Sequence, residues 1–237
     1  MSINRNRGPL YLQVKKAIKD RILHGIYPLG SLIPSEPQLE QEFAVSKMTV
    51  RNAVKELAQE GYVEKRSGIG TKVIRNTSFS KLSKGKRFTE VLVEEGHKIQ
   101  KKLLSLKVIR TEDNSELYGM FGDMCLQVNR LYILDGHPYV HYTHYLRSVF
   151  SDEDLGDLDH QSLYELIEEH HIELEKFRDS FTVAEATEEL GELLLIPQGK
   201  MLLKRIRHSY DSSGVLMEYS IGHYNTELQH YLVNYDA

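Results

Sequence analysis

Basic side chains at helical spacing are the first candidates for chemistry in this 237-residue sequence. Lys47, Arg51 and Lys55 stand at i, i+4 and i+8 after Ser46, so they share one face of a helix that the serine can cap. An arginine on such a face can donate two parallel hydrogen bonds to guanine, and lysine, serine and threonine can bind bases or phosphates. An ordinary solvated helix face has the same pattern, so the interpretation depends on the surrounding elements.

The net charge changes sign along the chain. Residues 1–87 contain 17 Lys/Arg and 7 Asp/Glu, whereas the rest contains 13 and 27, so the net charges are +10 and −14. A basic part joined to an acidic part suggests that only the first part binds a polyanion such as nucleic acid. A basic terminus that only aids solubility is the alternative explanation of this asymmetry.

Three helices are expected to position the basic stripe. Apolar residues recur every three or four positions over 11–22, which predicts an amphipathic helix. Ser35 and Gln38 have the spacing of a capping box, so a second helix begins there and continues to about Phe43. A third helix begins after Ser46 and carries the stripe. Two helices joined by a short turn are typical of a helix-turn-helix, whose second helix enters the major groove.

Two short strands and a linker follow the helices. Residues 62–65 and 71–74 are predicted to form a hairpin across a glycine-containing turn, which can approach a ligand backbone closely. The Ser/Lys-rich segment 76–86 lacks apolar periodicity and is interpreted as a linker. The hairpin and the linker favour DNA binding over a merely solvated basic helix. Residues 1–75 are therefore predicted to form a winged helix-turn-helix domain.

Several motifs of this region occur in order at the spacing of a known family. They are PLYLQ at 9–13, PSE at 34–36, SKMTVR at 46–51, EG at 60–61 and GIGT at 68–71. With them, residues 9–75 resemble the winged-helix domain of GntR-family transcription regulators. The DNA-contacting residues predicted from the resemblance and the helix pattern are Ser35, Ser46, Lys47, Thr49, Arg51 and Gly68.

The head departs from the family pattern at two positions. Pro37 stands where the family usually has an arginine, and Lys47 stands where arginine is commoner. A lysine lacks the planar fork of a guanidinium, so bidentate base contact is lost there. We expect an altered or weaker operator preference, with DNA binding retained.

The second part of the chain is predicted to be an α+β domain with an antiparallel sheet. Asp135 and Gly136 form a hairpin signal between two of its strands. Strands are expected over 103–109, 124–134, 139–146, 177–184, 201–210 and 216–224, and helices over 159–170 and 187–194.

This part also carries short motifs that occur in order after a GntR head. They are RFTE at 87–90, NRL at 129–131, DGHP at 135–138, SLY at 162–164, PQG at 197–199 and EYS at 218–220. With them, nearly all of residues 86–235 resembles the UTRA effector domain of the HutC subfamily, which shares the chorismate lyase fold. The resemblance implies that a small cytoplasmic metabolite, often a sugar phosphate, controls DNA binding.

The resemblance also implies a set of effector-binding residues: Phe88, Thr89, Arg130, Ser162, Tyr164, Lys176, Glu218 and Tyr224. Arg130 would pair with an anionic ligand group, and Glu218 would accept from ligand hydroxyls or an amine. Tyr164 and Tyr224 are equally well explained as core aromatic residues with a satisfied hydroxyl. A solvent-facing salt bridge is the alternative for Glu218.

Two departures bear on the effector. Tyr132 stands where sugar-phosphate sensors often have a second arginine, and Asn225 stands where a basic residue is common. With two phosphate-binding cations absent, a neutral sugar or a ligand with one carboxylate becomes more plausible. The expected effector is carbohydrate-derived, and its phosphorylation is left open.

Other chemistry has little support in the sequence. His141 and His144 lie three apart on a predicted strand and point to opposite faces, and no metal-ligand spacing accompanies the other histidines. Neither a catalytic nucleophile nor a cofactor motif is found, and the single Cys125 in an apolar strand is expected to be inert. Without an apolar run of the ~20 residues that a membrane helix needs, a soluble cytoplasmic protein with no membrane partner is expected.

These observations predict a ligand-responsive transcription regulator, a repressor rather than an activator. Its predicted parts are a winged helix-turn-helix domain at 1–75, a linker at 76–86 and an effector and dimerisation domain at 87–237. As a homodimer it would bind a palindromic double-stranded operator. The alternatives are a chorismate lyase-like enzyme and a DNA-binding dimer without an effector.

Overall fold

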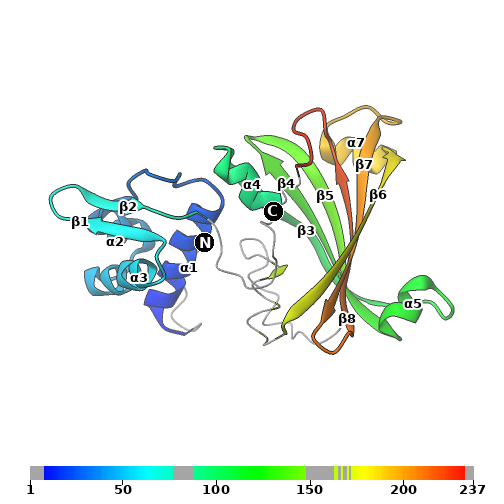
Figure 1. Cartoon of the computed structure of the whole chain (residues 1–237), viewed down its shortest axis with the longest axis horizontal. Coiled ribbons are helices and arrows are strands. Elements are labelled where there is room, and N and C mark those ends of the chain that lie inside the picture. The colour runs from blue at the N-terminus through cyan, green and yellow to red at the C-terminus, as the bar shows by residue number, and fades with distance from the viewer. Residues whose placement is uncertain are drawn as a thin grey trace, which may run out of the picture. The chain divides into compact units, whose positions relative to one another are not determined.

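The computed structural model describes residues 8–76, 88–147, 163–164, 167, 170 and 172–232, which fall into two compact units (Figure 1). The first unit holds the described residues up to Ile99, and the second holds those from Gln100 onwards. We call residues 8–76 the head and residues 100–232 the sheet unit. The predicted fold class, a helix-turn-helix head followed by an α+β domain with an antiparallel sheet, is confirmed.

The head contains three helices near their predicted positions. They are α1 (Leu10–Leu23), α2 (Glu36–Phe43) and α3 (Lys47–Gln59). The Ser35 backbone N–H and hydroxyl both donate to Gln38 Oε1 at 2.8 Å, and the Ser46 hydroxyl accepts from the Thr49 N–H at 3.3 Å. These caps satisfy backbone donors that a helix start leaves free, which is why α2 and α3 begin at these serines.

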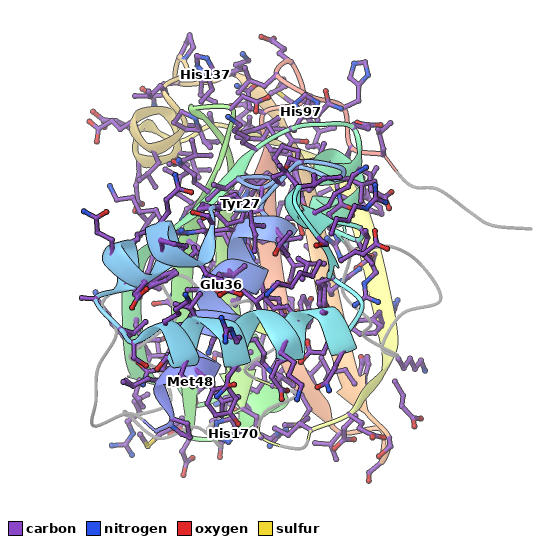
Figure 2. All side chains as sticks on the ribbon, turned by 90° about the vertical axis from the view of Figure 1, so that its left-hand side faces the viewer. Tyr27, Glu36, Met48, His97, His137 and His170 are labelled. Carbon is purple, nitrogen blue, oxygen red and sulfur yellow. The ribbon has the colours of Figure 1, made fainter. Side chains whose placement is uncertain are left out.

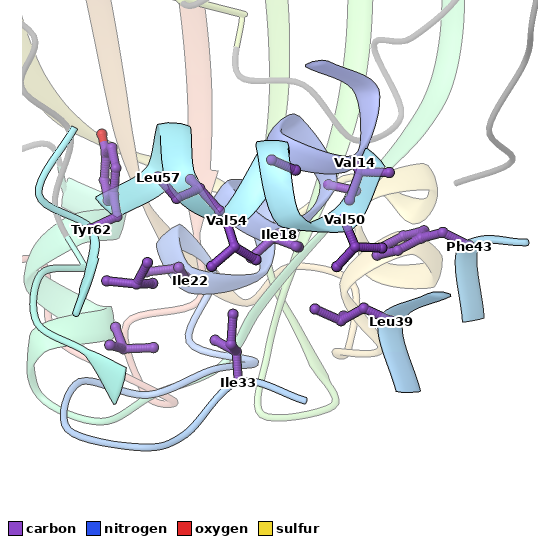
Figure 3. Close-up of a cluster of buried hydrophobic side chains, with 14 residues drawn as sticks. Val14, Ile18, Ile22, Ile33, Leu39, Phe43, Val50, Val54, Leu57 and Tyr62 are labelled. Atoms are coloured by element: carbon purple, nitrogen blue, oxygen red, sulfur yellow. The ribbon is translucent and has the colours of Figure 1, made fainter. Parts of the chain in front are cut away.

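A two-stranded wing follows the helices and completes the head. Strands β1 (Val63–Arg66) and β2 (Gly70–Val73) pair antiparallel, and Leu32 forms an isolated bridge to Lys72 beside them. Apolar side chains of α1, α2, α3 and the wing form one core, shown in Figure 3. The largest fully buried members of this core are Ile18, Ile22, Leu39, Leu57 and Tyr62.

Helix α4 (Phe88–Glu94) belongs to the first unit. The Ile99 N–H donates to the His24 carbonyl oxygen at 3.1 Å, which ties the segment after α4 to the end of α1. Gly25 lies at φ +74°, and a Cβ there would come within 2.5 Å of the His97 carbonyl oxygen. The turn after α1 therefore needs a glycine both for its backbone conformation and for this close approach.

The sheet unit is built on six antiparallel strands in the order β3-β4-β5-β8-β7-β6. The strands are β3 (Ile99–Arg110), β4 (Met124–Leu134), β5 (His137–Arg147), β6 (Leu174–Glu185), β7 (Met201–Asp211) and β8 (Leu216–Tyr224). Asp135 and Gly136 both have positive φ, 48° and 89°, as the predicted two-residue hairpin between β4 and β5 requires. The last strand that the structure describes, β8, thus lies in the middle of the sheet.

Helices cover parts of the sheet. Helix α7 (Glu188–Leu194) was predicted from residue 187 onwards, and it packs with Leu131 and Leu202. Helix α5 (Glu116–Phe121) was not predicted, because six residues are too few to show helical periodicity. Figure 1 shows α5 and α7 at opposite ends of the strands. None of the helices in the described part of the chain has the length and apolar character that a membrane crossing requires.

Candidate DNA-binding surface and buried polar site

The basic stripe lies on the outer face of α3. Lys47, Arg51 and Lys55 are all exposed, whereas Val50 and Val54 on the opposite face are buried in the head core. The side chains are thus placed as the helical spacing predicted. A helix with a free basic face and an apolar inner face can be inserted into a groove of DNA without disturbing the core.

The hydroxyl groups near the stripe have local partners. The Ser46 and Thr49 hydroxyls are 2.9 Å apart, and the Ser35 hydroxyl donates to Gln38. These side chains therefore fix the starts of α2 and α3, which were predicted as capped. Any phosphate contact by Ser35 or Ser46 would be made alongside this capping role.

Glu36 connects the recognition helix to the wing. One carboxylate oxygen accepts from Lys65 Nζ at 2.6 Å, and the other lies 3.4 Å from Arg51 Nη2. The hydrogen bond from Lys65, helped by the charge of Arg51, lowers the pKa of Glu36, although its partial burial opposes this. Figure 2, which faces the head, labels Glu36 and the exposed Met48 on α3. Glu36 therefore holds one cation of α3 and one cation of the wing.

A groove of about 920 Å³ lies between the start of α2 and the wing. Its lining includes Glu36, Lys65 and the wing residues Gly68 and Ile69. Gly68 has φ +75° with no atom near its Cβ position, and Ile69 beside it is 63% exposed. The wing turn is thus a glycine turn that projects a short apolar side chain next to cations.

A buried polar site occupies one face of the sheet. Cross-strand register places its residues in three neighbouring rows. The rows are Arg130-Tyr142-Gly222-Arg205-Phe181, Val128-His144-Ser220-Arg207-Asp179 and Leu126-Leu146-Glu218-Ser209-Phe177. Because alternate residues along a strand share a face, these rows and Tyr224 point to the same side of the sheet. We call the polar side chains of this face, together with the helical Tyr164, the polar cluster.

Glu218 is the centre of the polar cluster and is fully buried. It accepts from His144 Nδ1 at 2.8 Å, from the Ser209 hydroxyl at 2.6 Å and from the Tyr164 hydroxyl at 3.0 Å. Burial alone would raise the pKa of Glu218, but the bonds from His144 and Ser209 and the nearby Arg207 lower it to about 2. Burial lowers the pKa of His144, so a neutral imidazole donates to an ionised carboxylate.

Arg207 and Asp179 form a bidentate pair beside Glu218. Arg207 Nε and Nη2 each lie 2.7 Å from an Asp179 carboxylate oxygen, and Nη1 lies 3.3 Å from the Tyr164 hydroxyl. Burial would raise the pKa of Asp179, but the hydrogen bond from Arg207 reverses this and lowers it. Burial raises the pKa of Tyr164 to about 12, so its hydroxyl stays protonated and donates to Glu218. A geometry of this kind fixes both partners of the pair.

Arg205 lies among tyrosines at the other end of the cluster. Its Nη1 is 3.3 Å from the Tyr224 hydroxyl and 3.5 Å from the Tyr142 hydroxyl, and those two hydroxyls are hydrogen-bonded to each other. Its guanidinium carbon lies 5.7 Å from the ring centre of Tyr231. Nη2 lies 3.3 Å from Asp179, which already binds Arg207 more closely. A ligand on this face would meet hydroxyls, carboxylates and guanidinium groups within a few rows.

The structure brings some of the predicted effector-binding residues together and separates others. Arg130, Glu218 and Tyr224 lie on the site face, and Tyr164 donates to Glu218. Lys176 is exposed, pairs with the position of Tyr210 and lies on the opposite face from its neighbour Phe177. Phe88 and Thr89 begin α4 in the first unit. Ser162 lies outside the described residues.

The alternative of a solvent-facing salt bridge for Glu218 is wrong, because this side chain is fully buried and its hydrogen bonds are internal. Tyr132 stands where sugar-phosphate sensors often have a second arginine. Its ring packs edge-to-face with the ring of Tyr142, and the two ring centres are 5.2 Å apart. Asn225 is 5% exposed and is therefore part of the interior.

Four members of the cluster were not predicted from the sequence: His144, Asp179, Arg205 and Arg207. Arg205 and Arg207 stand two apart on a predicted strand, which was a signal that both side chains share a face. Which face they share, and what lies across from them, depends on β8 being inserted between β5 and β7. Of the two departures from the family pattern, Tyr132 lies on β4 and Asn225 directly follows β8, whereas Arg205 and Arg207 lie on β7.

Cys125 is buried, and burial raises the pKa of its thiol. Among the residues that the structure describes, no group of three His, Cys, Asp or Glu side chains could hold a metal ion.

Comparison with known proteins gives the same two parts. Residues 10–73 match the family described as bacterial regulatory proteins, gntR family, and residues 94–229 match the UTRA domain. The mannosyl-D-glycerate transport/metabolism system repressor MngR of Escherichia coli is 26% identical over 222 residues, 92% of each chain. The transcriptional repressor NagR of Bacillus subtilis is 25% identical over 224 residues, 93% of this chain and 92% of NagR. The crystal structure of PhnF from Mycobacterium smegmatis matches with a TM-score of 0.57 and 25% identity, covering 94% of this chain and 99% of that one.

Proposed function

The chain belongs to the UTRA-domain proteins and carries a GntR-family head, so it is a DNA-binding transcription regulator with an effector domain and not an enzyme, and we propose that a carbohydrate-derived metabolite bound at the polar cluster controls its binding to an operator. The predicted family, fold and regulator function are thereby confirmed, and the lyase-like alternative is set aside. The protein is proposed to repress transcription and to act in the cytoplasm. It is proposed to bind a palindromic operator as a homodimer.

The surface proposed to bind DNA consists of α3 and the wing. Arg51 is the residue proposed to read a base edge, and Lys47 and Thr49 at the start of α3 are proposed to contact bases or phosphates. Ser35 and Ser46, which cap α2 and α3, and Gly68 in the wing turn are proposed to approach the DNA backbone. What supports this is the exposed basic face of α3 together with the cations that Glu36 holds beside it.

The observation that carries the effector proposal is the composition of the polar cluster. Glu218, fully buried, is an ionised acceptor surrounded by hydroxyl donors, and Arg130, also fully buried, lies on the same face. A buried network of this kind can exchange its internal hydrogen bonds for those of a ligand rich in hydroxyl groups. Tyr164, which donates to Glu218, and Tyr224, whose hydroxyl lies 3.3 Å from Arg205 Nη1, are proposed to contact the same ligand.

The carbohydrate class is also supported by one relative. MngR is named as the repressor of a mannosyl-D-glycerate system, and it aligns with this chain over nearly its whole length. The coupling between effector and operator requires that the effector binds one conformation of the protein better than another. Typical coupling between two such sites is ~1–3 kcal/mol, or about 5- to 150-fold in operator affinity.

The proposed function can be tested by fluorescence anisotropy of the full-length protein on DNA from upstream of its own gene and on a scrambled duplex. The salt concentration is fixed, since phosphate contacts make affinity strongly salt-dependent. A panel of sugars, sugar acids and sugar phosphates is then added. We expect preferential binding to the upstream DNA and a change of affinity by one carbohydrate-derived compound. Response only to amino acids or nucleotides would contradict the proposed effector class.

Arg130→Gln provides the matched variant for this experiment. Because Arg130 is proposed to bind the effector and not DNA, the variant should keep operator affinity and lose the response to the active compound. Circular dichroism and the melting temperature show whether the variant is folded. Loss of operator binding by a folded variant would refute this role for Arg130.

A further inference from the structure

Arg205 is only 5% exposed, and it shares its counterion, Asp179, with Arg207. Asp179 is the carboxylate within reach, at 3.3 Å from Arg205 Nη2. Both oxygens of Asp179 lie 2.7 Å from nitrogens of Arg207, so its charge is engaged mainly by that arginine. The other carboxylate of the cluster, Glu218, accepts from His144, Ser209 and Tyr164. Arg205 therefore shares an already satisfied carboxylate.

The remaining contacts of Arg205 are to neutral groups. The Tyr142 and Tyr224 hydroxyls lie at 3.5 and 3.3 Å from Nη1, at the long end of hydrogen-bond distances. Arg205 Nε is buried and has no hydrogen-bond partner among the residues that the structure describes. A guanidinium stays charged in proteins, so burial cannot be relieved by loss of its proton. A buried cation in this position has unused capacity for an anion.

The side chains next to Arg205 on the site face are those of Tyr142 and Tyr224. Gly222 lies beside Arg205 in its row, and the rings of these two tyrosines occupy the space over it. Burial raises the pKa of both Tyr142 and Tyr224, so their hydroxyls remain protonated and can donate to an anion. Two phenol donors and a guanidinium that converge are the groups that recognise a carboxylate or a phosphate.

We propose that Arg205, with the hydroxyls of Tyr142 and Tyr224, binds an acidic group of the effector. The effector is then an acidic carbohydrate, with a carboxylate or a phosphate, and not a neutral sugar. This inference rests on the proposed function, because it places the effector on the same face as Glu218. Glu218 and Arg205 lie two rows apart, with about 13 Å between the rows along the strands. The hydroxyl-bearing part of the ligand faces Glu218 and its acidic part faces Arg205.

The test uses the full-length protein, melted at constant ionic strength set with sodium chloride. The probes are glucose, gluconate, glucuronate, glucose 6-phosphate, inorganic phosphate and sulfate. We expect at least one anionic probe to raise the melting temperature of the wild type above the chloride control, and glucose to have no such effect. Calorimetric titration of that probe into Arg205→Gln should show an affinity about 10- to 100-fold weaker than that of the wild type. This is the loss expected when one or two hydrogen bonds to a charged group are removed. Arg178→Gln, an exposed arginine of β6, should bind within about twofold of wild type.

The unliganded variants separate an anion-binding arginine from a structural one. Arg207 has a bidentate counterion, so Arg207→Gln should lower the melting temperature without ligand. Arg205→Gln should leave that temperature unchanged or raise it, because it removes a buried charge while Asp179 keeps its bidentate pair with Arg207. If Arg205→Gln does not fold, Arg205→Lys, which keeps the charge without the fork, should bind the anionic probe about tenfold more weakly.

The inference is overturned if no anionic probe stabilises the wild type beyond chloride, if glucose binds as tightly as its acid, or if the Arg205 variants keep wild-type affinity for the anion. Operator anisotropy with the same probes separates this from the proposed function. A neutral sugar that changes operator affinity contradicts the role of Arg205 and leaves the proposed function intact. An anion that binds through Arg205 without changing operator affinity supports the site and contradicts effector control. A response to gluconate or glucuronate but not to glucose 6-phosphate identifies the acidic group as a carboxylate.

Discussion

The head and the sheet unit place their charged side chains in opposite locations. The head has a core cluster of hydrophobic residues, and its cations Lys47, Arg51 and Lys65 are exposed. The sheet unit buries Arg205 and Glu218 on one face of its strands. Exposed charges attract a polyanion at long range and are screened by salt, whereas buried charges act on groups in contact with them and each needs a partner. The two units are thus suited to two ligands of very different size.

The largest expected effect comes from breaking the buried network. Glu218→Ala should destabilise the protein by ~3–5 kcal/mol, because it leaves the donors of His144, Ser209 and Tyr164 buried without their common acceptor. Urea unfolding followed by circular dichroism measures this change. Glu218→Gln, which keeps the shape and one acceptor oxygen, should cost less. Equal stability of Glu218→Ala and wild type would show that the network does not contribute to the fold.

Adding a side-chain atom to the same face should reduce stability less than removing the Glu218 carboxylate does. A Cβ at Gly222 would lie 2.6 Å from Tyr142 Cε1, so Gly222→Ala should displace that ring and destabilise the protein by ~1–3 kcal/mol. Gly119 in α5 has no atom within 4 Å of its Cβ position, so Gly119→Ala is the control and should be neutral or slightly stabilising. Thermal melts of both variants provide the comparison. Equal effects of the two substitutions would contradict the tight packing of Tyr142 over Gly222.

On the head, a single exposed arginine should affect recognition without affecting the fold. Arg51→Ala should weaken operator binding by ~1–3 kcal/mol and reduce discrimination against scrambled DNA. Lys55→Ala should instead weaken binding to both duplexes alike and lower the salt slope by about one. Anisotropy titrations at several salt concentrations distinguish the two outcomes. Unchanged discrimination by Arg51→Ala would exclude base contact by this residue.

Acid should act on the buried network in a defined pH range. Glu218 has a folded-state pKa of about 2 against an ordinary value of 4.5, so its contribution to stability is present above pH 4.5 and is lost as pH falls towards 2. The lowered pKa of His144 adds a loss that begins below pH 6.5, where the unfolded imidazole takes up a proton. Urea unfolding at pH 7, 5.5, 4.5 and 3.5 measures both losses. Glu218→Gln should flatten the part of the curve below pH 4.5, and an unchanged slope there would contradict an ionised Glu218.

The smallest effect on stability is expected from Glu36, which pairs with two exposed cations on the head. Glu36→Gln should change stability by ~0–1 kcal/mol, because its partners Arg51 and Lys65 are exposed. The same change removes a negative charge from the surface proposed to bind DNA and releases both cations. Affinity for scrambled DNA should therefore rise more than affinity for the operator, by about two- to fivefold. Anisotropy on both duplexes tests this, and a fall in both affinities would show that Glu36 mainly positions Arg51.

Local signals in the sequence predicted most of the fold. The helix caps Ser35 and Ser46 and the hairpin pair Asp135-Gly136 act only on a few neighbouring residues. Helices α2 and α3 begin after these serines, and the β4-β5 hairpin turns at Asp135-Gly136, as predicted. Arg130 and Glu218 were identified through resemblance, and both lie on the site face. Arg205 and Asp179 were missed because their proximity depends on register between strands that are distant in sequence. Such register is set by the whole sheet and not by any local pattern.

The position of β8 has a consequence for synthesis of the protein. This strand is the last of the described strands, and it joins the β4-β5 hairpin to the β7-β6 pair at the centre of the sheet. Domains generally fold in order as the chain leaves the ribosome. The head can therefore fold early, while the two halves of the site face stay apart until residue 224 has been made. With the effector bound at the polar cluster as proposed, a nascent or prematurely terminated chain would carry a folded head without a complete effector site.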